Sequence, residues 1–138
     1  MKKTLMLVPC LIFFVFSIFA QEKQYKIVFD FTKADTVNFS TIVRQATNIM
    51  NMTGNAKLEI VCHGPGLDLL IKDKTTVQKE IEELHSKFNV VFVACEATMR
   101  RRGINKSQLL PMTITVPAAN LELAFKQQQG WSYIKAGY

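Results

Sequence analysis

Apolar residues in this chain occur in two alternating patterns, short continuous runs and longer stretches with helical spacing. Largely apolar runs of the kind that fill a buried parallel strand lie at 25–31, 58–62 and 90–94. Two shorter runs at 113–116 and 131–134 have the same character. The pattern therefore predicts five strands.

Between these runs, apolar side chains recur every three or four residues, which is the spacing of an amphipathic helix. Helix-capping residues, a capping box, a proline and glycines mark where these helices begin and end. The expected helices run from Asp35 or Thr36 to Gly54, over 75–88 with Thr75 and Gln78 as a capping box at its start, and from Pro117 to Gly130. A further short helix is expected directly after Cys95.

Strands that alternate with helices at these lengths predict an α/β fold, a single three-layer domain with a five-stranded parallel sheet. We expect the flavodoxin-like strand order 2-1-3-4-5. The strands that end in Cys62 and Cys95 would then flank the first strand, roughly 10 Å apart at ~4.8 Å per neighbour. A disulfide needs Cα atoms within about 7 Å, so we expect two separate thiols.

Residues 1–20 have the composition of a secretory signal peptide. Two lysines precede an apolar stretch over 5–19, and Ala20 ends a small-residue cleavage site. An uncleaved anchor and a lipoprotein signal at Cys10 are the alternatives. We expect cleavage to leave one domain, 21–138, that is periplasmic or otherwise exported and has no membrane segment of its own.

The whole chain carries a net charge of +6, and removal of the two signal lysines leaves 15 basic against 11 acidic residues, or +4. The only dense basic cluster is Arg100–Arg102, whereas a nucleic-acid site needs basic residues along a face with aromatic residues between them. We therefore expect no nucleic-acid partner. His63 and His85 lie far apart and no CxxC motif occurs, so neither a metal nor a cofactor is expected.

Cys95 is the main candidate for chemistry, because it stands between the apolar run 90–94 and an arginine-rich polar segment. A thiol at the junction of a strand and a helix faces unpaired N–H groups and the positive end of the helix dipole, which favour the reactive thiolate. Arg100 would add positive potential, and Glu96 would oppose it. The alternative is that Cys95 is a small apolar residue at a strand end.

The loop after the second apolar run supplies the other candidates. His63 has the pKa of a group that acts as base or as anion ligand near neutrality, or it orients the turn. Gly64 and Gly66 would form a stiff turn whose N–H groups bind an anion. Cys62 reads as a buried strand residue, with a secondary thiol as the alternative.

Three segments together resemble the DsrE/DsrF-like sulfur-relay family. They are 61–67 (VCHGPGL), 92–99 (FVACEATM) with Gly103 and Ile104, and the stretch from Val116-Pro117 through 129–134 (QGWSYI). The resemblance spans essentially all of the domain and implies the same fold, a homo-oligomer (dimer, trimer or hexamer) and a persulfide carried on Cys95. The partners would be a sulfur donor and acceptor thiols. Ala97 departs from the pattern, because many relatives have asparagine there.

The sequence thus leaves three hypotheses open. The first is a sulfur carrier or sulfurtransferase that works through Cys95. The second is a non-catalytic module that binds a small anion or ligand in the strand-end pocket near His63 and Cys95. The third is an oligomeric partner-binding protein in which Trp131 and Tyr133 form an interface.

Overall fold

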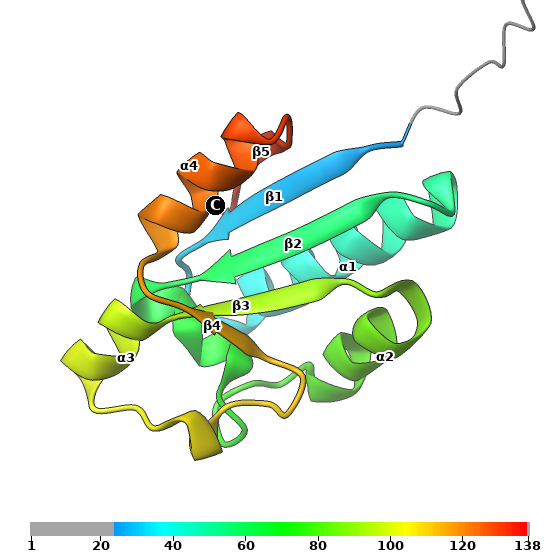
Figure 1. Cartoon of the computed structure of the whole chain (residues 1–138). Helices are drawn as coiled ribbons and strands as arrows, with labels where there is room; N and C mark the ends of the chain where they lie inside the picture. The colour runs from blue at the N-terminus through cyan, green and yellow to red at the C-terminus, as the bar shows by residue number, and fades with distance from the viewer. Residues whose placement is uncertain (1–23, 138) are drawn as a thin grey trace, which may run out of the picture.

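The computed structural model describes residues 24–137 (Figure 1). Strands and helices alternate along the whole of this range, as the apolar pattern predicted. The elements are β1 (Lys26–Phe31), α1 (Thr36–Thr53), β2 (Lys57–Cys62), η1 (Gly64–Leu70), α2 (Gln78–Phe88), β3 (Val91–Cys95), α3 (Glu96–Arg102), η2 (Lys106–Gln108), β4 (Ile114–Val116), α4 (Ala119–Gln128) and β5 (Ser132–Ala136).

The strands form one five-stranded parallel sheet, which confirms the predicted α/β class and the three-layer domain. The strand order in space is β4-β3-β2-β1-β5 rather than the expected 2-1-3-4-5. It remains consistent with a flavodoxin-like arrangement, but β2 lies between β1 and β3. The apolar runs specify which segments are strands and not which strands pair, so the sequence pattern could not settle this point.

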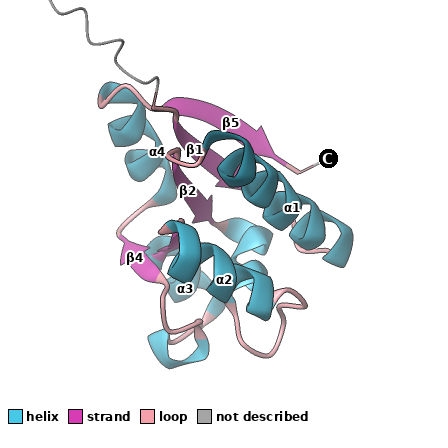
Figure 2. Ribbon diagram, turned by 90° about the vertical axis from the view of Figure 1, so that its right-hand side faces the viewer, coloured by secondary structure: helices cyan, strands magenta, loops and turns pink. Residues whose placement is uncertain are grey.

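Helices cover both faces of the sheet, with α1 and α4 on opposite sides (Figure 2). The larger core cluster joins α1 and α2 to alternate strand residues such as Phe29, Ile60 and Phe92. The smaller cluster lies under α4 and contains Val28, Val61 and the other residues of opposite pleat. Among residues 24–137, none of the helices is long and apolar enough to cross a membrane.

The observed order brings the ends of β2 and β3 together at the carboxyl edge of the sheet. Cys62 pairs in register with Ala94, so Cys95 lies one residue further along the neighbouring strand. Because successive side chains point to opposite faces, Cys62 packs in the larger cluster and Cys95 in the smaller one. Cys62 and Cys95 are both free, as expected. They are separated because they lie on opposite faces of the sheet, whereas the expected strand order had placed a strand between them.

Candidate functional site

Cys95 is the last residue of β3 and the N-cap of α3. Its backbone is extended (φ −79°, ψ 113°), so the chain turns from strand to helix at this residue. The Sγ atom accepts a hydrogen bond from the backbone N–H of Ala119 at 3.4 Å. Ala119 is the first residue of α4. The amino ends of two helices therefore converge on one sulfur atom. The sequence predicted the contribution of α3 but not that of α4.

The pKa of the Cys95 thiol lies below its ordinary value, although burial acts to raise it. Hydrogen bonds outweigh the burial, first from the N–H of Thr98 and then from the N–H of Ala119, the hydroxyl of Thr98 and the N–H of Ala97. Hydrogen bonds to a charged form stabilise that form. Backbone N–H groups and the Thr98 hydroxyl thus favour the thiolate.

Thr98 connects the thiol to the loop that follows β2. It is buried, and its Oγ1 accepts a hydrogen bond from the N–H of Gly64 at 3.1 Å while the hydroxyl serves Cys95. Arg102 reinforces the same connection, because its Nη1 donates to the carbonyl of Gly64 at 2.9 Å and its Nη2 pairs with Asp68. The His-Gly-Pro-Gly loop is thereby fixed to α3.

The N–H groups of Gly64 and Gly66, which the sequence predicted as anion ligands, both have hydrogen-bond partners within the protein. The N–H of Gly64 bonds Thr98, and the N–H of Gly66 donates to the carbonyl of His63 at 3.0 Å. The segment continues as the 3₁₀ helix η1, whose first turn contains the hydrogen bond of the Gly66 N–H. Gly66 is needed for a steric reason, because a Cβ there would lie 2.4 Å from the carbonyl oxygen of Phe31.

The structure places two other predicted binding residues on the outer side of α3. Arg100 is exposed, and its Nη1 lies 3.8 Å from Oε2 of Glu96. Glu96 Oε1 accepts a hydrogen bond from the hydroxyl of Thr115 at 2.9 Å. The partner observed for Arg100 is therefore Glu96, and Arg102 is the arginine that contacts the loop.

Cys62 has the opposite electrostatic setting. It is fully buried in the larger core cluster. Burial raises the pKa of its thiol far above the ordinary value, and the negative charge of Asp30 adds a smaller rise. A buried thiol of this kind is inert. Cys62 is therefore a packing residue, as the sequence favoured.

A polar cluster that the sequence analysis missed surrounds Asp30 at the end of β1. Asp30 Oδ1 lies 2.7 Å from Nε2 of His63. Its Oδ2 accepts from the hydroxyl of Tyr133 at 2.7 Å and from Nζ of Lys135 at 3.0 Å. Burial raises the pKa of Asp30, but these three partners outweigh it and lower the pKa. The bond to Asp30 raises the pKa of Tyr133 to about 12.

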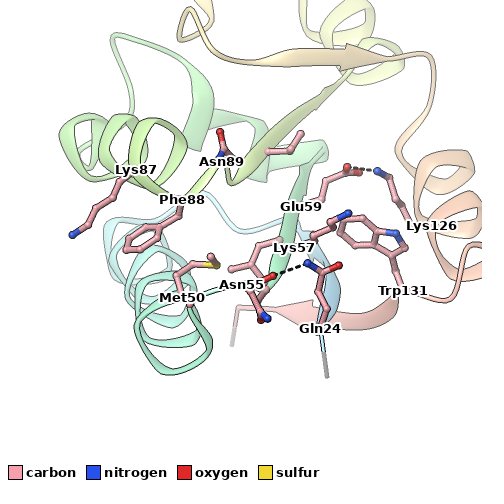
Figure 3. Close-up of a pocket in the computed structure, with 14 residues that line it drawn as sticks. Gln24, Met50, Asn55, Lys57, Glu59, Lys87, Phe88, Asn89, Lys126 and Trp131 are labelled. Atoms are coloured by element: carbon pink, nitrogen blue, oxygen red, sulfur yellow. Dashed lines mark hydrogen bonds and ion pairs between the residues drawn. The ribbon is translucent and has the colours of Figure 1, made fainter. Parts of the chain in front are cut away.

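A cleft of about 540 Å³ opens at the other end of the sheet, at the amino ends of the strands (Figure 3). Its walls include Glu59, Lys126 and Trp131. Lys126 Nζ lies 2.5 Å from Glu59 Oε2 and 4.6 Å from the centre of the Trp131 ring. These residues pair with one another and lie far along the strands from Cys95. Within residues 24–137, no group of three His, Cys, Asp or Glu side chains is arranged to hold a metal ion.

Comparison with known families gives a match to the DsrE/DsrF-like family over residues 12–136. The chain belongs to this family. The family membership expected from the sequence is thus confirmed, and the family is associated with sulfur relay. Comparison with curated proteins finds no relative.

Solved structures of three proteins share the fold. A protein of unknown function from Methanobacterium thermoautotrophicum is 25% identical, with a TM-score of 0.76 over 81% of this chain and 99% of that chain. The ychN protein from E. coli is 15% identical, with a TM-score of 0.65 over 84% and 100% of the two chains. A conserved protein of unknown function from Bacteroides thetaiotaomicron is 22% identical, with a TM-score of 0.65 over 80% and 93%.

Proposed function

We propose that this DsrE/DsrF-like protein is a sulfur carrier that holds sulfane sulfur as a persulfide on Cys95. The observation that carries the proposal is the convergence of two helix amino ends on the Cys95 sulfur, with the Ala119 N–H at 3.4 Å. These donors stabilise negative charge on the sulfur, and the thiolate is the form that attacks a persulfide or polysulfide. Membership of the family supports the same reading.

In the loading step, the Cys95 thiolate attacks a sulfane sulfur of the donor and forms a new S–S bond. The bond between that sulfur and the rest of the donor breaks, and the leaving thiolate or polysulfide keeps the electron pair. In the unloading step, an acceptor thiolate attacks the outer sulfur and Cys95 leaves as thiolate. The helix N–H groups stabilise Cys95 whenever it carries the charge.

The small opening at the Cys95 thiol limits the size of the sulfur donor. Only 4% of Cys95 is exposed, because the start of α4 covers the sulfur. A small anionic polysulfide suits such an opening better than a rigid protein surface does. The two helix amino ends would attract an anion of this kind.

The alternative of a non-catalytic anion-binding module has less support. The N–H groups of Gly64 and Gly66, which would hold the anion, already have partners within the protein. A purely structural role for Cys95 would not require the hydrogen bonds that lower the pKa of its thiol. These contacts are the specific reason to favour a sulfur carrier.

The proposal includes an exported homo-oligomer. Leu121 and Phe125 are exposed and lie four residues apart on α4, so they form an apolar strip on the helix that covers Cys95. Burial of such side chains between copies would stabilise an assembly. Light scattering of the purified protein tests this, and a Leu121→Glu/Phe125→Glu variant should shift any oligomer toward monomer.

The experiment that tests the carrier function compares the wild type with Cys95→Ser and Cys62→Ala variants after brief incubation with polysulfide. Intact mass and peptide mapping should find one added sulfur on Cys95 in the wild type and in Cys62→Ala, and none in Cys95→Ser. The added sulfur should pass to a small thiol. No loading, or loading on Cys62 alone, contradicts the proposal.

A further inference from the structure

Asp30 is held in one position by groups from two sides. Its carboxylate is mostly buried at the end of β1, with Oδ1 on His63 Nε2 at 2.7 Å. Tyr133 and Lys135 from the neighbouring strand β5 donate to Oδ2 at 2.7 and 3.0 Å. Both oxygens are thus used, and only the bond to His63 points toward the end of β2. A carboxylate with this many fixed partners is suited to orient the one imidazole that it touches.

His63 lies beside Cys95 on the same face of the sheet. The register pairs Phe31 with Cys62 and Cys62 with Ala94. The His63 N–H donates to the carbonyl of Phe31 at 3.1 Å, so the ladder between β1 and β2 continues for one more residue. His63 and Cys95 each follow this last register row, on adjacent strands spaced ~4.8 Å apart. His63 and Cys95 are therefore neighbours in the sheet, while the imidazole turns toward Asp30 and makes no hydrogen bond with the thiol.

The contact with Asp30 also selects the tautomer of His63. An ionised carboxylate only accepts hydrogen bonds, so the ring must carry its proton on Nε2, the atom that faces Asp30. This assignment follows from the hydrogen bond. Neutral His63 then keeps its lone pair on Nδ1, the ring nitrogen away from the carboxylate. A base oriented by a carboxylate next to a sulfur nucleophile has the parts of a proton-transfer site.

We propose that Asp30 is a positioning residue that keeps His63 as the general base for the thiol that accepts sulfur from Cys95. The inference rests on the proposed function and adds the acceptor side of the reaction. Cys95 needs no base of its own, because backbone N–H groups already favour its thiolate. An incoming acceptor arrives as a neutral thiol at neutral pH and must lose a proton before it can attack.

The transfer step moves one proton to His63 and one electron pair to Cys95. The acceptor thiol gives its proton to Nδ1 of His63, and the imidazolium that forms is stabilised by Asp30 through Nε2–H. The acceptor thiolate forms a bond to the outer sulfur of the Cys95 persulfide. The S–S bond to Cys95 breaks, Cys95 leaves as thiolate with the electron pair, and the acceptor becomes a persulfide. His63 then returns the proton to water.

Charged and titratable groups lie near His63, one in direct contact and the others through a shared partner or a neighbouring strand. They are Asp30 from β1, Cys95 from β3, Arg102 of α3 through the carbonyl of Gly64, and Tyr133 and Lys135 of β5 through Asp30. Asp30 accepts a hydrogen bond from the imidazole itself.

The test measures sulfur transfer from preloaded Cys95 to two acceptors, N-acetylcysteine and sulfite. Sulfite attacks through a lone pair on sulfur, and much of it is already deprotonated at pH 7, so it needs no base from the protein. Asp30→Asn should slow transfer to N-acetylcysteine at pH 7 by roughly ten- to a hundredfold, and its rate should then follow the ionisation of the acceptor thiol. Transfer to sulfite should stay within about twofold of the wild type, since the base is bypassed.

Two further variants separate positioning from stability. Asp73→Asn makes the same chemical change at an exposed aspartate away from the site, so it should transfer to both acceptors like the wild type. His63→Gln should reproduce the thiol-specific loss, and Asp30→Asn added to it should cause no further loss. If Asp30→Asn does not fold, the His63→Gln variant still tests whether His63 acts as the base. Nitrogen NMR should find His63 protonated on Nε2 in the wild type.

The outcomes distinguish this inference from the function on which it rests. Normal loading with equal losses toward both acceptors, or with no loss toward N-acetylcysteine, overturns the base role and leaves the carrier function standing. Protonation of neutral His63 on Nδ1 overturns it as well. A wild type that takes no sulfur on Cys95 overturns the carrier function, and the base role with it.

Discussion

At the scale of single residues, the acidity of Cys95 comes from backbone N–H groups. Only Thr98 adds a side-chain donor, while Arg100 pairs with Glu96 and Arg102 with the loop. Backbone donors at helix ends cannot rotate away or lose their proton, so the stabilisation of the thiolate persists as other groups titrate. Substitutions of the arginines should therefore matter less for this thiol than changes at the start of α4.

Ala119→Pro should make Cys95 less reactive while α4 remains folded. Proline removes the N–H that donates to Sγ, yet it is well tolerated at the first position of a helix. Ala118, the residue before it, already has the extended backbone that a following proline requires (φ −152°, ψ 131°). The pKa of Cys95 should rise toward its ordinary value, and alkylation by iodoacetamide at pH 7 should slow roughly three- to tenfold.

Ala119→Gly is the matched control for this variant, because it changes the same side chain and retains the N–H. It should alkylate at nearly the wild-type rate, with circular dichroism confirming helix content in both variants. An unchanged alkylation rate in Ala119→Pro would mean that the hydrogen bond from α4 contributes nothing to the acidity of Cys95.

At the scale of elements, the loop and η1 after β2 depend on two glycines for different physical reasons. Gly66 packs against the end of β1, where an added Cβ would meet backbone atoms of Phe31 and Thr32 at 2.4 to 2.8 Å. Gly64 has open space around its Cα but a φ of +54°. Gly66→Ala should lower the free energy of unfolding by about 3 kcal/mol, and Gly64→Ala by about 1 kcal/mol.

Urea denaturation measures both costs. Both variants replace glycine by alanine, two residues apart. The difference between their free energies of unfolding therefore compares the cost of steric overlap at Gly66 with the cost of backbone strain at Gly64. Equal costs, or a larger cost for Gly64→Ala, would contradict this account of the loop. Gly64→Ala should also keep the hydrogen bond to Thr98, since alanine retains the N–H.

Local signals in the sequence predicted the elements well where a side chain makes the signal. Asp35 caps α1, with its carboxylate accepting from the Asn38 N–H, and Gly54 ends the helix in the left-handed conformation, both as expected. The capping box at Thr75 and Gln78 was wrong. The Thr75 hydroxyl accepts from the Val77 N–H, and α2 begins only at Gln78. The same polar residues support a turn as readily as a helix start.

The candidate site was predictable only in part, because much of it depends on tertiary contacts. Cys95 was found because a thiol at the junction of strand and helix is a local pattern. The Ala119 N–H has no side-chain signature, and Tyr133 and Lys135 meet Asp30 only because β5 pairs with β1. An incorrect strand order hides such contacts, since strand order decides which distant residues become neighbours.

At the scale of the whole molecule, the two faces of the sheet differ in how they are covered. The face under α1 and α2 is apolar, whereas the face under α4 contains Glu59, a carboxylate only 2% exposed in the middle of the sheet. Lys126 of α4 neutralises it at 2.5 Å and contacts Trp131. This ion pair joins α4 to the sheet at the end opposite Cys95, so it helps to hold the helix whose first N–H reaches the thiol.

Lys126→Met should lower the free energy of unfolding at pH 8 by about 3 kcal/mol or more, because it leaves a buried carboxylate without its counter-ion. Burial raises the pKa of Glu59, and Lys126 opposes that rise, so the pKa should rise further in the variant. A carboxyl group with a raised pKa in the folded state binds a proton more readily there than in the unfolded chain. The stability it contributes is present below the unfolded pKa of 4.5 and is lost as the pH rises through the folded value.

Lys126→Met should therefore be closer to the wild type at pH 5 than at pH 8 in urea denaturation. Lys87→Met is the control, because Lys87 is 61% exposed and its ion pair with Glu83 should contribute little at either pH. A Glu59→Met/Lys126→Met double variant removes both charges and should recover much of the lost stability. A cost that does not change with pH would mean that α4 is held to the sheet by packing around the lysine stem, and that the charge of Glu59 does not control how firmly the helix covers Cys95.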